Sequence, residues 1–264
     1  MKSLIFSFML LFFCAACHKD NSVIRVAATP IPHAEMLEFI KPELKKRGVT
    51  LEVVEIDDYN LPNRLLEEGR VDANFFQHEP FLKAQEKEFG YDFVILKQIH
   101  FEPLGIYSSK LTSLNMLQTG STIAIPSDPS NEARALQLLE REGIIGLKNP
   151  QDPLATLLDI ASNPKRIRFQ EVDAAFLPRI LPDVDLAIIP GNFALQGNLS
   201  PSQALAKEPS CSPYANLLIT LKGSETRPEL ILIGDLLSSK EMQAFLNEKF
   251  KGALEIVKCP TSAQ

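Results

Sequence analysis

Alternating apolar and polar positions divide the chain into short strands and amphipathic helices. Residues 23–28 and 50–56 have the two-residue periodicity of strands. Residues 34–44, between them, carry apolar side chains at helical spacing, and Gly48 stands where a helix C-terminal cap belongs. Further helices are predicted at 61–68 and 80–89, and further strands at 71–76 and 93–96. This order predicts a parallel sheet with right-handed helical crossovers.

A second group of elements follows residues 101–107, a segment predicted to leave one unit for another. Strands are expected at 121–126, 167–172 and 185–189, and helices at 128–142 and 176–181. Residues 213–221 form a strand that could return to the first sheet, and the chain closes with helices at 229–238 and 241–250. The pattern therefore predicts an α/β protein of two lobes, joined by two crossings, with a cleft between the lobes.

The stretch 71–81, VDANFFQHEPF, joins a predicted strand directly to a predicted helix. The proline suits the first turn of a helix, because its missing N–H would have had no partner there, so the helix is expected to start at Glu79. Phe76, Gln77 and His78 are then expected on the strand-to-helix connection. Connections of this kind hold ligands in α/β sheets, which makes this stretch a candidate site.

The N-terminus has the pattern of an export signal. One lysine precedes an uninterrupted apolar run, residues 4–17, which is shorter than the roughly 20 residues of a membrane-spanning helix. The run ends in Ala-Ala-Cys, which resembles the lipobox of bacterial lipoproteins, where the cysteine is acylated. We therefore expect residues 1–16 to be a lipoprotein signal peptide, Cys17 to carry the lipid and residues 17–22 to be a tether. An ordinary secretory peptide cleaved nearby is the alternative.

Composition and charge exclude several classes of protein. The 264 residues are 45% hydrophobic and 23% charged, as in folded globular proteins, and the net charge is −6. The only basic run is 45–47, so neither nucleic acid nor a membrane-surface helix is indicated. Cys14 and Cys17 lie inside the export signal and form no redox or zinc motif. Cys211 and Cys259 could form a disulfide in an oxidising compartment, although the sequence does not give their distance.

A candidate anion site lies at the start of the helix predicted at 128–142. Asp128 can cap this helix, and Asn131 and Arg134, three residues apart, share one face of it. A helix N-terminus offers free N–H groups to an anion, and the guanidinium of Arg134 matches a carboxylate in bidentate geometry. The alternative is that Arg134 is a solvated surface arginine.

Asn192 and Asn216 are candidates for recognising the charged groups of an amino acid. Asn192 ends the sequence Ile-Ile-Pro-Gly-Asn and Asn216 ends Pro-Tyr-Ala-Asn, so both are expected near a strand or loop end. An amide offers a donor and an acceptor together, which suits the ammonium and carboxylate of one zwitterion. The alternative at each position is a turn-forming asparagine.

Taken jointly, six short motifs resemble those of the methionine-binding lipoproteins of bacterial ABC importers, the NlpA/MetQ lipoprotein family. The motifs occur in the family's order and at its spacing. With the lipobox, the resemblance extends over nearly the whole chain. With x for any residue, they are DYxLPN at 58–63, DANxFQHxPF at 72–81, DPSNxxR at 128–134, NP at 163–164, LPR at 177–179 and SPYxN at 212–216. Each motif alone is weak, but the set is specific.

The resemblance implies a two-lobed, periplasmic-binding-protein-like (type II) fold that closes on D- or L-methionine or a close analogue. Four side chains would line the part of the cleft that takes the thioether, since aromatic rings suit a polarizable sulfur: Tyr59, Phe76, His78 and Phe81. Arg134, with Asn131 beside it, would hold the carboxylate. Asn192 and Asn216 would take the ammonium and the remaining carboxylate oxygen. The chain departs from the family at Phe81, where tyrosine is frequent, and in the Pro-Gly-Asn-Phe surroundings of Asn192.

The same resemblance implies lobe boundaries and partners. The first lobe would comprise residues 23–106 and 213–264, and the second lobe residues 107–212. The protein would be lipid-anchored in the cell envelope, periplasmic or on the outer face, and would deliver its ligand to an ABC permease and its ATPase. It would not be an enzyme, and it would need neither a cofactor nor a metal.

Three other interpretations arise from the residues. A metal-binding carrier would need histidines and carboxylates to converge on an ion; the candidates are His33, His78, His100, Glu35, Glu79 and Glu102. An enzyme is disfavoured because the chain lacks nucleophile-elbow, Walker A, dinucleotide-binding and zincin motifs, and an acid/base pair of His78 and Glu79 would point apart. The third is a surface interaction protein that has kept the fold and lost transport.

Overall fold

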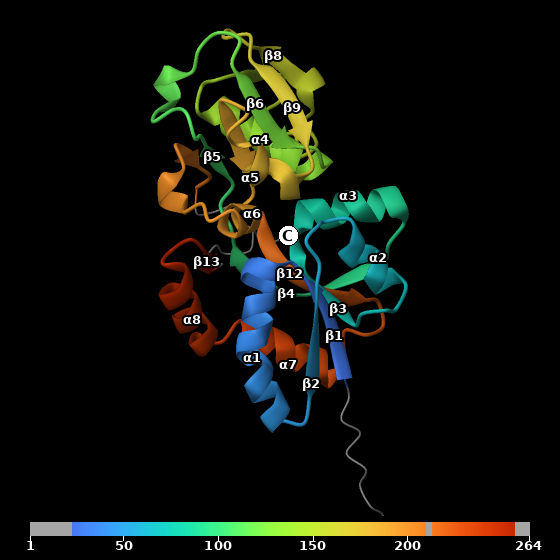
Figure 1. Cartoon of the computed structure of the whole chain (residues 1–264). Coiled ribbons are helices and arrows are strands. Elements are labelled where there is room, and N and C mark those ends of the chain that lie inside the picture. The colour runs from blue at the N-terminus through green and yellow to red at the C-terminus, as the bar shows by residue number, and fades with distance from the viewer. Residues whose placement is uncertain (1–22, 210–212, 257–264) are drawn as a thin grey trace, which may run out of the picture.

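In the computed structural model, which describes residues 23–209 and 213–256, the chain forms two lobes, each built around its own sheet (Figure 1). The predicted signal peptide, tether and lipidated Cys17 lie outside the described residues, as do Cys211 and Cys259, the predicted disulfide partners. Among the described residues, no helix is both long and apolar enough to cross a membrane.

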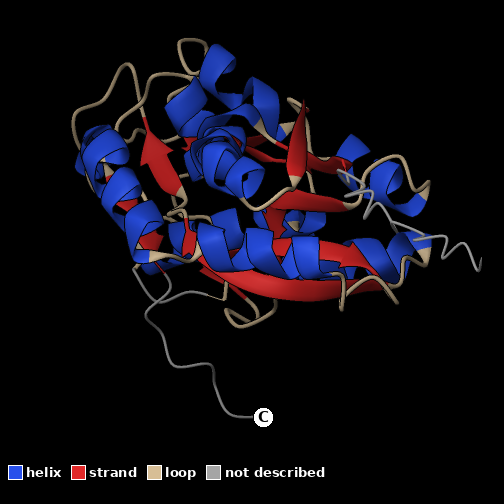
Figure 2. Cartoon of the chain, turned by 90° about the horizontal axis from the view of Figure 1, so that it is seen from below, coloured by secondary structure: helices blue, strands red, loops and turns tan. Residues whose placement is uncertain are grey.

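Six strands form the sheet of the first lobe, in the order β13-β4-β12-β3-β1-β2. Their bounds are β1 Val23–Ala28, β2 Thr50–Glu55, β3 Ala73–His78, β4 Phe93–Phe101, β12 Ala215–Leu221 and β13 Glu255–Ile256. On one face of this sheet pack α1 (Glu35–Lys46), α7 (Pro228–Leu237) and α8 (Lys240–Phe250). On the other face pack α2 (Leu61–Glu67) and α3 (Glu79–Phe89). Figure 2 shows helices lying along the strands.

Five strands form the sheet of the second lobe, in the order β11-β5-β10-β6-β9. Their bounds are β5 Gly105–Tyr107, β6 Thr122–Pro126, β9 Arg168–Val172, β10 Leu186–Ile189 and β11 Ala206–Lys207. One face is covered by α4 (Pro129–Arg141), and the other by α5 (Leu177–Ile180) and α6 (Gly191–Gln196). The shorter elements are the pair β7 (Gly146–Leu147) and β8 (Ile160–Ser162), and the single turns η1 Pro30–Ala34, η2 Leu114–Met116, η3 Leu157–Asp159, η4 Ala174–Phe176 and η5 Pro201–Gln203.

The four strands predicted to form a parallel sheet, β1 to β4, run in one direction, but both sheets also contain antiparallel strands, which the prediction did not include. The strands β1, β2 and β3 are parallel, but β12 runs antiparallel to β3 and β4, and β5 runs antiparallel to β10. The reason lies in the crossings between the lobes. The chain leaves the first sheet at the end of β4 and returns at the start of β12, where Ala215 pairs with Phe101. Since both crossings meet the sheet at the same end, the returning strand must run in the opposite direction.

Candidate functional site

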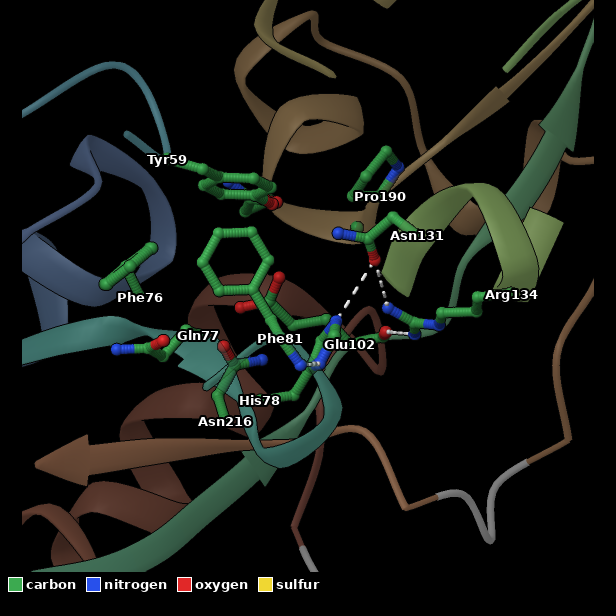
Figure 3. A pocket seen from close by; sticks show the side chains of 12 residues that line it. Tyr59, Phe76, Gln77, His78, Phe81, Glu102, Asn131, Arg134, Pro190 and Asn216 are labelled. Atoms are coloured by element: carbon green, nitrogen blue, oxygen red, sulfur yellow. Dashed lines mark hydrogen bonds between the residues drawn. The ribbon is translucent and has the colours of Figure 1, made fainter. Parts of the chain in front are cut away.

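A small cavity lies between the two lobes (Figure 3). The free space inside it is about 20 Å³, well below the roughly 300–1,000 Å³ of small-molecule sites, so the lining residues must move apart to admit a ligand of the size of an amino acid. The lining includes all eight residues predicted to bind a ligand: Tyr59, Phe76, His78, Phe81, Asn131, Arg134, Asn192 and Asn216. Gln77, Glu102, Pro190 and Gly191 complete it. The fold therefore brings the sequence-predicted residues of both lobes around one space.

Strand β3 carries Phe76, Gln77 and His78 to the cavity. The prediction that these residues lie on a connection is wrong, because β3 runs to His78 and α3 begins at Glu79 without an intervening loop. All residues of β3 are buried, since helices cover both faces of the sheet. The side chain of His78 is the N-cap of α3: its Nδ1 accepts a hydrogen bond from the backbone N–H of Phe81 at 3.2 Å.

The imidazole of His78 also links the two lobes. Its Nε2 lies 3.1 Å from Oδ1 of Asn131 on α4. Burial, helped by the charge of Arg134, lowers the pKa of His78 to about 3, so the ring is neutral at pH 7. Because Nδ1 accepts the hydrogen bond from Phe81, Nε2 carries the proton and donates it to Asn131. The amide of Asn131 is held in turn by the carboxylate of Asp128, which accepts from its Nδ2 at 3.0 Å.

Aromatic rings form the apolar end of the cavity. The ring centroid of Tyr59 lies 5.8 Å from that of Phe76, 5.7 Å from that of Phe81 and 4.9 Å from that of Phe193. The rings of Phe76 and Phe81 are 5.7 Å apart and nearly perpendicular. These are the separations of favourable aromatic pairs, so the rings hold one another in place. Together they present faces and edges that suit a polarizable group such as a thioether.

Arg134 forms the polar end of the cavity, on the second turn of α4. The helix begins as predicted, with the side chain of Asp128 accepting from the backbone N–H of Asn131. Arg134 is only 4% exposed, so the alternative of a solvated arginine is wrong. Its Nε and Nη2 donate to Glu208 at 2.7 and 2.5 Å, and Nη2 also donates to the backbone oxygen of Glu102 at 2.8 Å. Among the described residues, the one hydrogen bond of Nη1 is to Oδ1 of Asn131, at 3.4 Å, so Nη1 is the guanidinium nitrogen with the most capacity left for a ligand.

Asn192 lies in the first turn of α6, a helix that the sequence pattern did not predict. The alternative of a turn-forming asparagine is therefore wrong at this position. Its Oδ1 accepts a hydrogen bond of 2.6 Å from the hydroxyl of Tyr59, which belongs to the other lobe. Its Nδ2 is buried and has no hydrogen-bond partner among the described residues. A buried donor of this kind is costly unless something else accepts from it.

A buried cluster of His33, His100 and Glu102 adjoins the polar end of the cavity. Nε2 of His100 lies 2.7 Å from Oε1 of Glu102, and Nε2 of His33 lies 3.3 Å from the same oxygen. Within the described residues, these three side chains are the group that could hold a metal ion, with ligand atoms inside 4.8 Å of one another. Of the six residues that the sequence offered as metal ligands, the structure therefore brings only these three together within the described residues. The contacts are those of hydrogen bonds from imidazoles to a carboxylate, which require no ion.

Two carboxylates at the polar end were not among the predicted ligand-binding residues. Glu102 lies between β4 and β5, and Glu208 lies between β11 and β12, so both belong to segments that cross between the lobes. The sequence had pointed to Glu102 only as a candidate metal ligand. Nothing in the sequence pointed to Glu208, because its partner Arg134 is 74 residues away in the sequence and only the fold brings the two together. The lining residue Gln77 was expected on the connection but was not assigned to the ligand.

The buried histidines make the stability of the protein depend on pH. Burial lowers the pKa of His33 to about 4 although Glu102 opposes the shift, and the pKa of His78 is about 3. Both values lie below the ordinary value near 6.5, so the unfolded chain binds more protons and stability is lost as the pH falls from about 6.5. We expect each histidine to contribute a loss of about 3 kcal/mol in the free energy of unfolding between pH 7 and pH 4.

Urea unfolding at the two pH values measures this loss, and the variant His78→Gln isolates one contribution. Glutamine does not titrate, so between pH 7 and pH 4 the free energy of unfolding of the variant should fall by about 3 kcal/mol less than that of the original protein. Equal pH dependence in both proteins would show that His78 titrates normally in the folded state.

Comparison with known proteins gives concordant matches over most of the chain. A model of a family described as NlpA lipoprotein matches residues 24–257. Methionine-binding lipoprotein MetQ of Bacillus subtilis is 36% identical over 269 residues, covering 96% of this chain and 98% of that protein. D-methionine-binding lipoprotein MetQ of Escherichia coli K12 is 36% identical over 243 residues, covering 90% of each. The solved structure of a nutrient binding protein from Burkholderia cenocepacia bound to methionine matches with a TM-score of 0.86 at 40% identity, covering 88% of this chain and 99% of that chain.

Proposed function

Because the chain belongs to the NlpA lipoprotein family, we propose that it is the substrate-binding lipoprotein of an ABC importer and binds D- or L-methionine, or a close analogue, between its lobes. The family and the two-lobed α/β fold predicted from the sequence are confirmed. The protein is a binding protein and not an enzyme. One observation supports the proposal above all: a single cavity has an aromatic wall at one end and hydrogen-bonding charged groups at the other.

Each end of the cavity recognises a different part of the ligand. The rings of Tyr59, Phe76 and Phe81 take the thioether, which is apolar and polarizable. Nη1 of Arg134 and Nδ2 of Asn192 are donors with little or no engagement among the described residues, and they take the carboxylate. The distances within the aromatic wall and around Arg134 support these assignments.

We further propose how the protein is placed and divided. The first lobe comprises residues 23–106 and 213–264 and the second residues 107–212. The membership of the strands in the two sheets supports this division except at Gly105 and Ile106, which belong to β5 and therefore to the second sheet. A lipid on Cys17 holds the protein to the membrane on the periplasmic or outer face, and the permease and ATPase of the importer receive its ligand. The lipobox-like end of the apolar run at 4–17 and the names of its relatives support this placement.

Calorimetric titration with methionine tests the proposed function directly. Binding should be saturable at one site, and methionine at about 100 times its dissociation constant should raise the free energy of unfolding by about 2.7 kcal/mol. Norleucine, which replaces the sulfur with a methylene, is the matched control and should bind more weakly. Mass spectrometry of the small molecule that co-purifies with gently isolated protein gives a second readout. Stabilisation by a divalent metal ion and not by methionine would contradict the proposal.

A further inference from the structure

An apolar groove lies between the two lobes on the protein surface. One wall comes from α3 of the first lobe, which contributes Pro80 and Ala84, and the other wall comes from Pro153 and Leu154 of the second lobe. Pro213, on the second crossing segment, also lines the groove. The groove holds about 350 Å³ of free space, its surface is almost entirely apolar, and Leu154 is 40% exposed. An uncovered apolar groove with charged residues around it is typical of an interaction site.

Both walls of the groove are connected to helices that line the ligand cavity. In α3, Phe81 lines the cavity while Pro80 and Ala84 line the groove, so one helix separates the two spaces. The opposite wall is tied to α4, because Nε2 of Gln137 on that helix donates to the backbone oxygen of Asp152 at 2.9 Å. Figure 1 shows α3 facing the second lobe. Since the walls belong to different lobes, the groove has this shape only while the lobes lie together.

The chemistry of the lining favours a protein partner over a small ligand. Small-molecule sites carry a few convergent polar groups that fix the orientation of the ligand. Glu79, Lys83 and Lys87 also line the groove, but the surface that they give to it is that of their aliphatic stems. The side chain of Lys83 is 61% exposed, and its Nζ lies 2.8 Å from the carboxylate of Glu86. The groove therefore suits the apolar side chains of a partner, with charged groups of the partner at its rim.

The rim of the groove indicates the charge of that partner. Lys83 is paired with Glu86, whereas Lys87 has no ion-pair partner within the part of the chain that the structure describes. Glu79 is the carboxylate among the lining residues, but it stands in the first turn of α3, about 12 Å from Lys87 along the helix axis. A carboxylate of the partner would therefore be attracted to the end of the groove at Lys87.

We propose that this groove docks an outer loop of the importer's permease: an apolar side chain of the loop fills the groove, and a carboxylate of the loop meets Lys87. The inference rests on the proposed function and names the surface through which the protein meets its permease. A permease must distinguish protein that holds a ligand from protein that does not, and a groove with one wall from each lobe is present when the lobes lie together. A second copy of this chain fits less well, because a symmetric dimer would bring two rims together, each with two lysines and one glutamate.

The variant Leu154→Asp tests the apolar part of the groove. The permease–ATPase complex of the same importer is placed in nanodiscs with saturating methionine, and its ATP hydrolysis is measured as the binding protein is titrated in. We expect Leu154→Asp to raise the half-maximal concentration by about 30-fold, because a carboxylate in an apolar contact stays unpaired. Calorimetry should show methionine affinity changed by less than about 2-fold, since Leu154 does not line the ligand cavity. Leu158→Asp is the matched control: this leucine of the same lobe is 84% exposed, lies outside the groove and should leave both values unchanged.

The variant Lys87→Glu tests the charged part of the groove. We expect it to raise the half-maximal concentration by about 10-fold at low salt and by less at high salt, because salt screens the attraction between exposed charges. Lys45→Glu, on α1 at the other face of the first sheet, makes the same change of charge away from the groove and should have no effect.

The outcomes separate this inference from the proposed function. If the original protein binds no methionine, or leaves ATP hydrolysis by the complex unchanged, the proposed function fails whatever the variants show. If the original protein is active and both Leu154→Asp and Lys87→Glu keep its half-maximal concentration, the docking groove alone is overturned. Sedimentation of the original protein as a dimer that Leu154→Asp abolishes would overturn it as well, because a second copy would then occupy the groove.

Discussion

Replacing Arg134 with alanine is expected to weaken methionine binding by about 1,000-fold, the largest effect of any single substitution proposed for this cavity. The guanidinium is buried, and Nη1 is its nitrogen with the least engagement among the described residues. Without it the carboxylate of a zwitterion would enter the cavity unpaired, which costs far more than the loss of a neutral hydrogen bond. Isothermal titration calorimetry measures the change.

The same substitution should lower stability, because Glu208 would stay buried without its partner. Removing one member of a buried ion pair lowers the free energy of unfolding by about 3–5 kcal/mol, so this quantity must be measured together with the affinity. The double variant Arg134→Ala/Glu208→Ala removes both charges, and it should regain part of the stability without regaining affinity. Arg141→Ala, on the same helix but exposed, is the control for affinity and should bind methionine normally. Unchanged affinity in folded Arg134→Ala would refute the assignment.

Arg134 also contacts both segments that cross between the lobes. Its Nη2 donates to the backbone oxygen of Glu102 on the first crossing segment, and its guanidinium pairs with Glu208 on the second. Glu208 in turn accepts from the backbone N–H of Leu104. One side chain of the second lobe thus contacts both crossing segments, so a ligand that engages Arg134 contacts a residue of the junction between the lobes as well as of the cavity.

Local signals in the sequence predicted most elements but not the direction of every strand. The helix that ends at Gly90 was placed correctly, because the left-handed φ of 75° at that residue favours glycine and the sequence shows it. The direction of β12 depends on where the chain returns after a whole lobe, which no short window contains. The extension of β3 to His78 was missed because a strand buried on both faces loses the alternation that marks a half-exposed one.

The candidate site was predictable to the extent that its residues lie in short motifs. Tyr59, Phe76 and Arg134 stand in such motifs and all line the cavity. Glu102 and Glu208 could not be assigned in this way, because their importance comes from partners on other segments: two histidines for the first and Arg134 for the second. A carboxylate in an interlobe crossing looks like any surface carboxylate until the fold buries it.

Asn192→Ala is expected to weaken methionine binding by about 100-fold, second only to Arg134→Ala among the effects argued here. Nδ2 of Asn192 is a buried donor without a partner among the described residues, and Oδ1 accepts from Tyr59 across the cleft. Alanine removes the donor that we propose for the ligand carboxylate, together with a hydrogen bond between the two lobes. Calorimetry measures the loss, and Asn115→Ala, an exposed asparagine of the second lobe, is the control that should bind normally.

A double-mutant cycle with Tyr59→Phe separates the two roles of Asn192. If the Tyr59 hydroxyl acts by orienting the Asn192 amide, Tyr59→Phe alone should weaken binding by about 5-fold to 10-fold, and by less than about 2-fold when Asn192 is already alanine. Additive losses would mean that the hydroxyl acts on the ligand independently of Asn192. Full affinity in Asn192→Ala would contradict the assignment. It would mean that Nδ2 of Asn192, which is buried and has no partner among the described residues, makes no hydrogen bond to the ligand either.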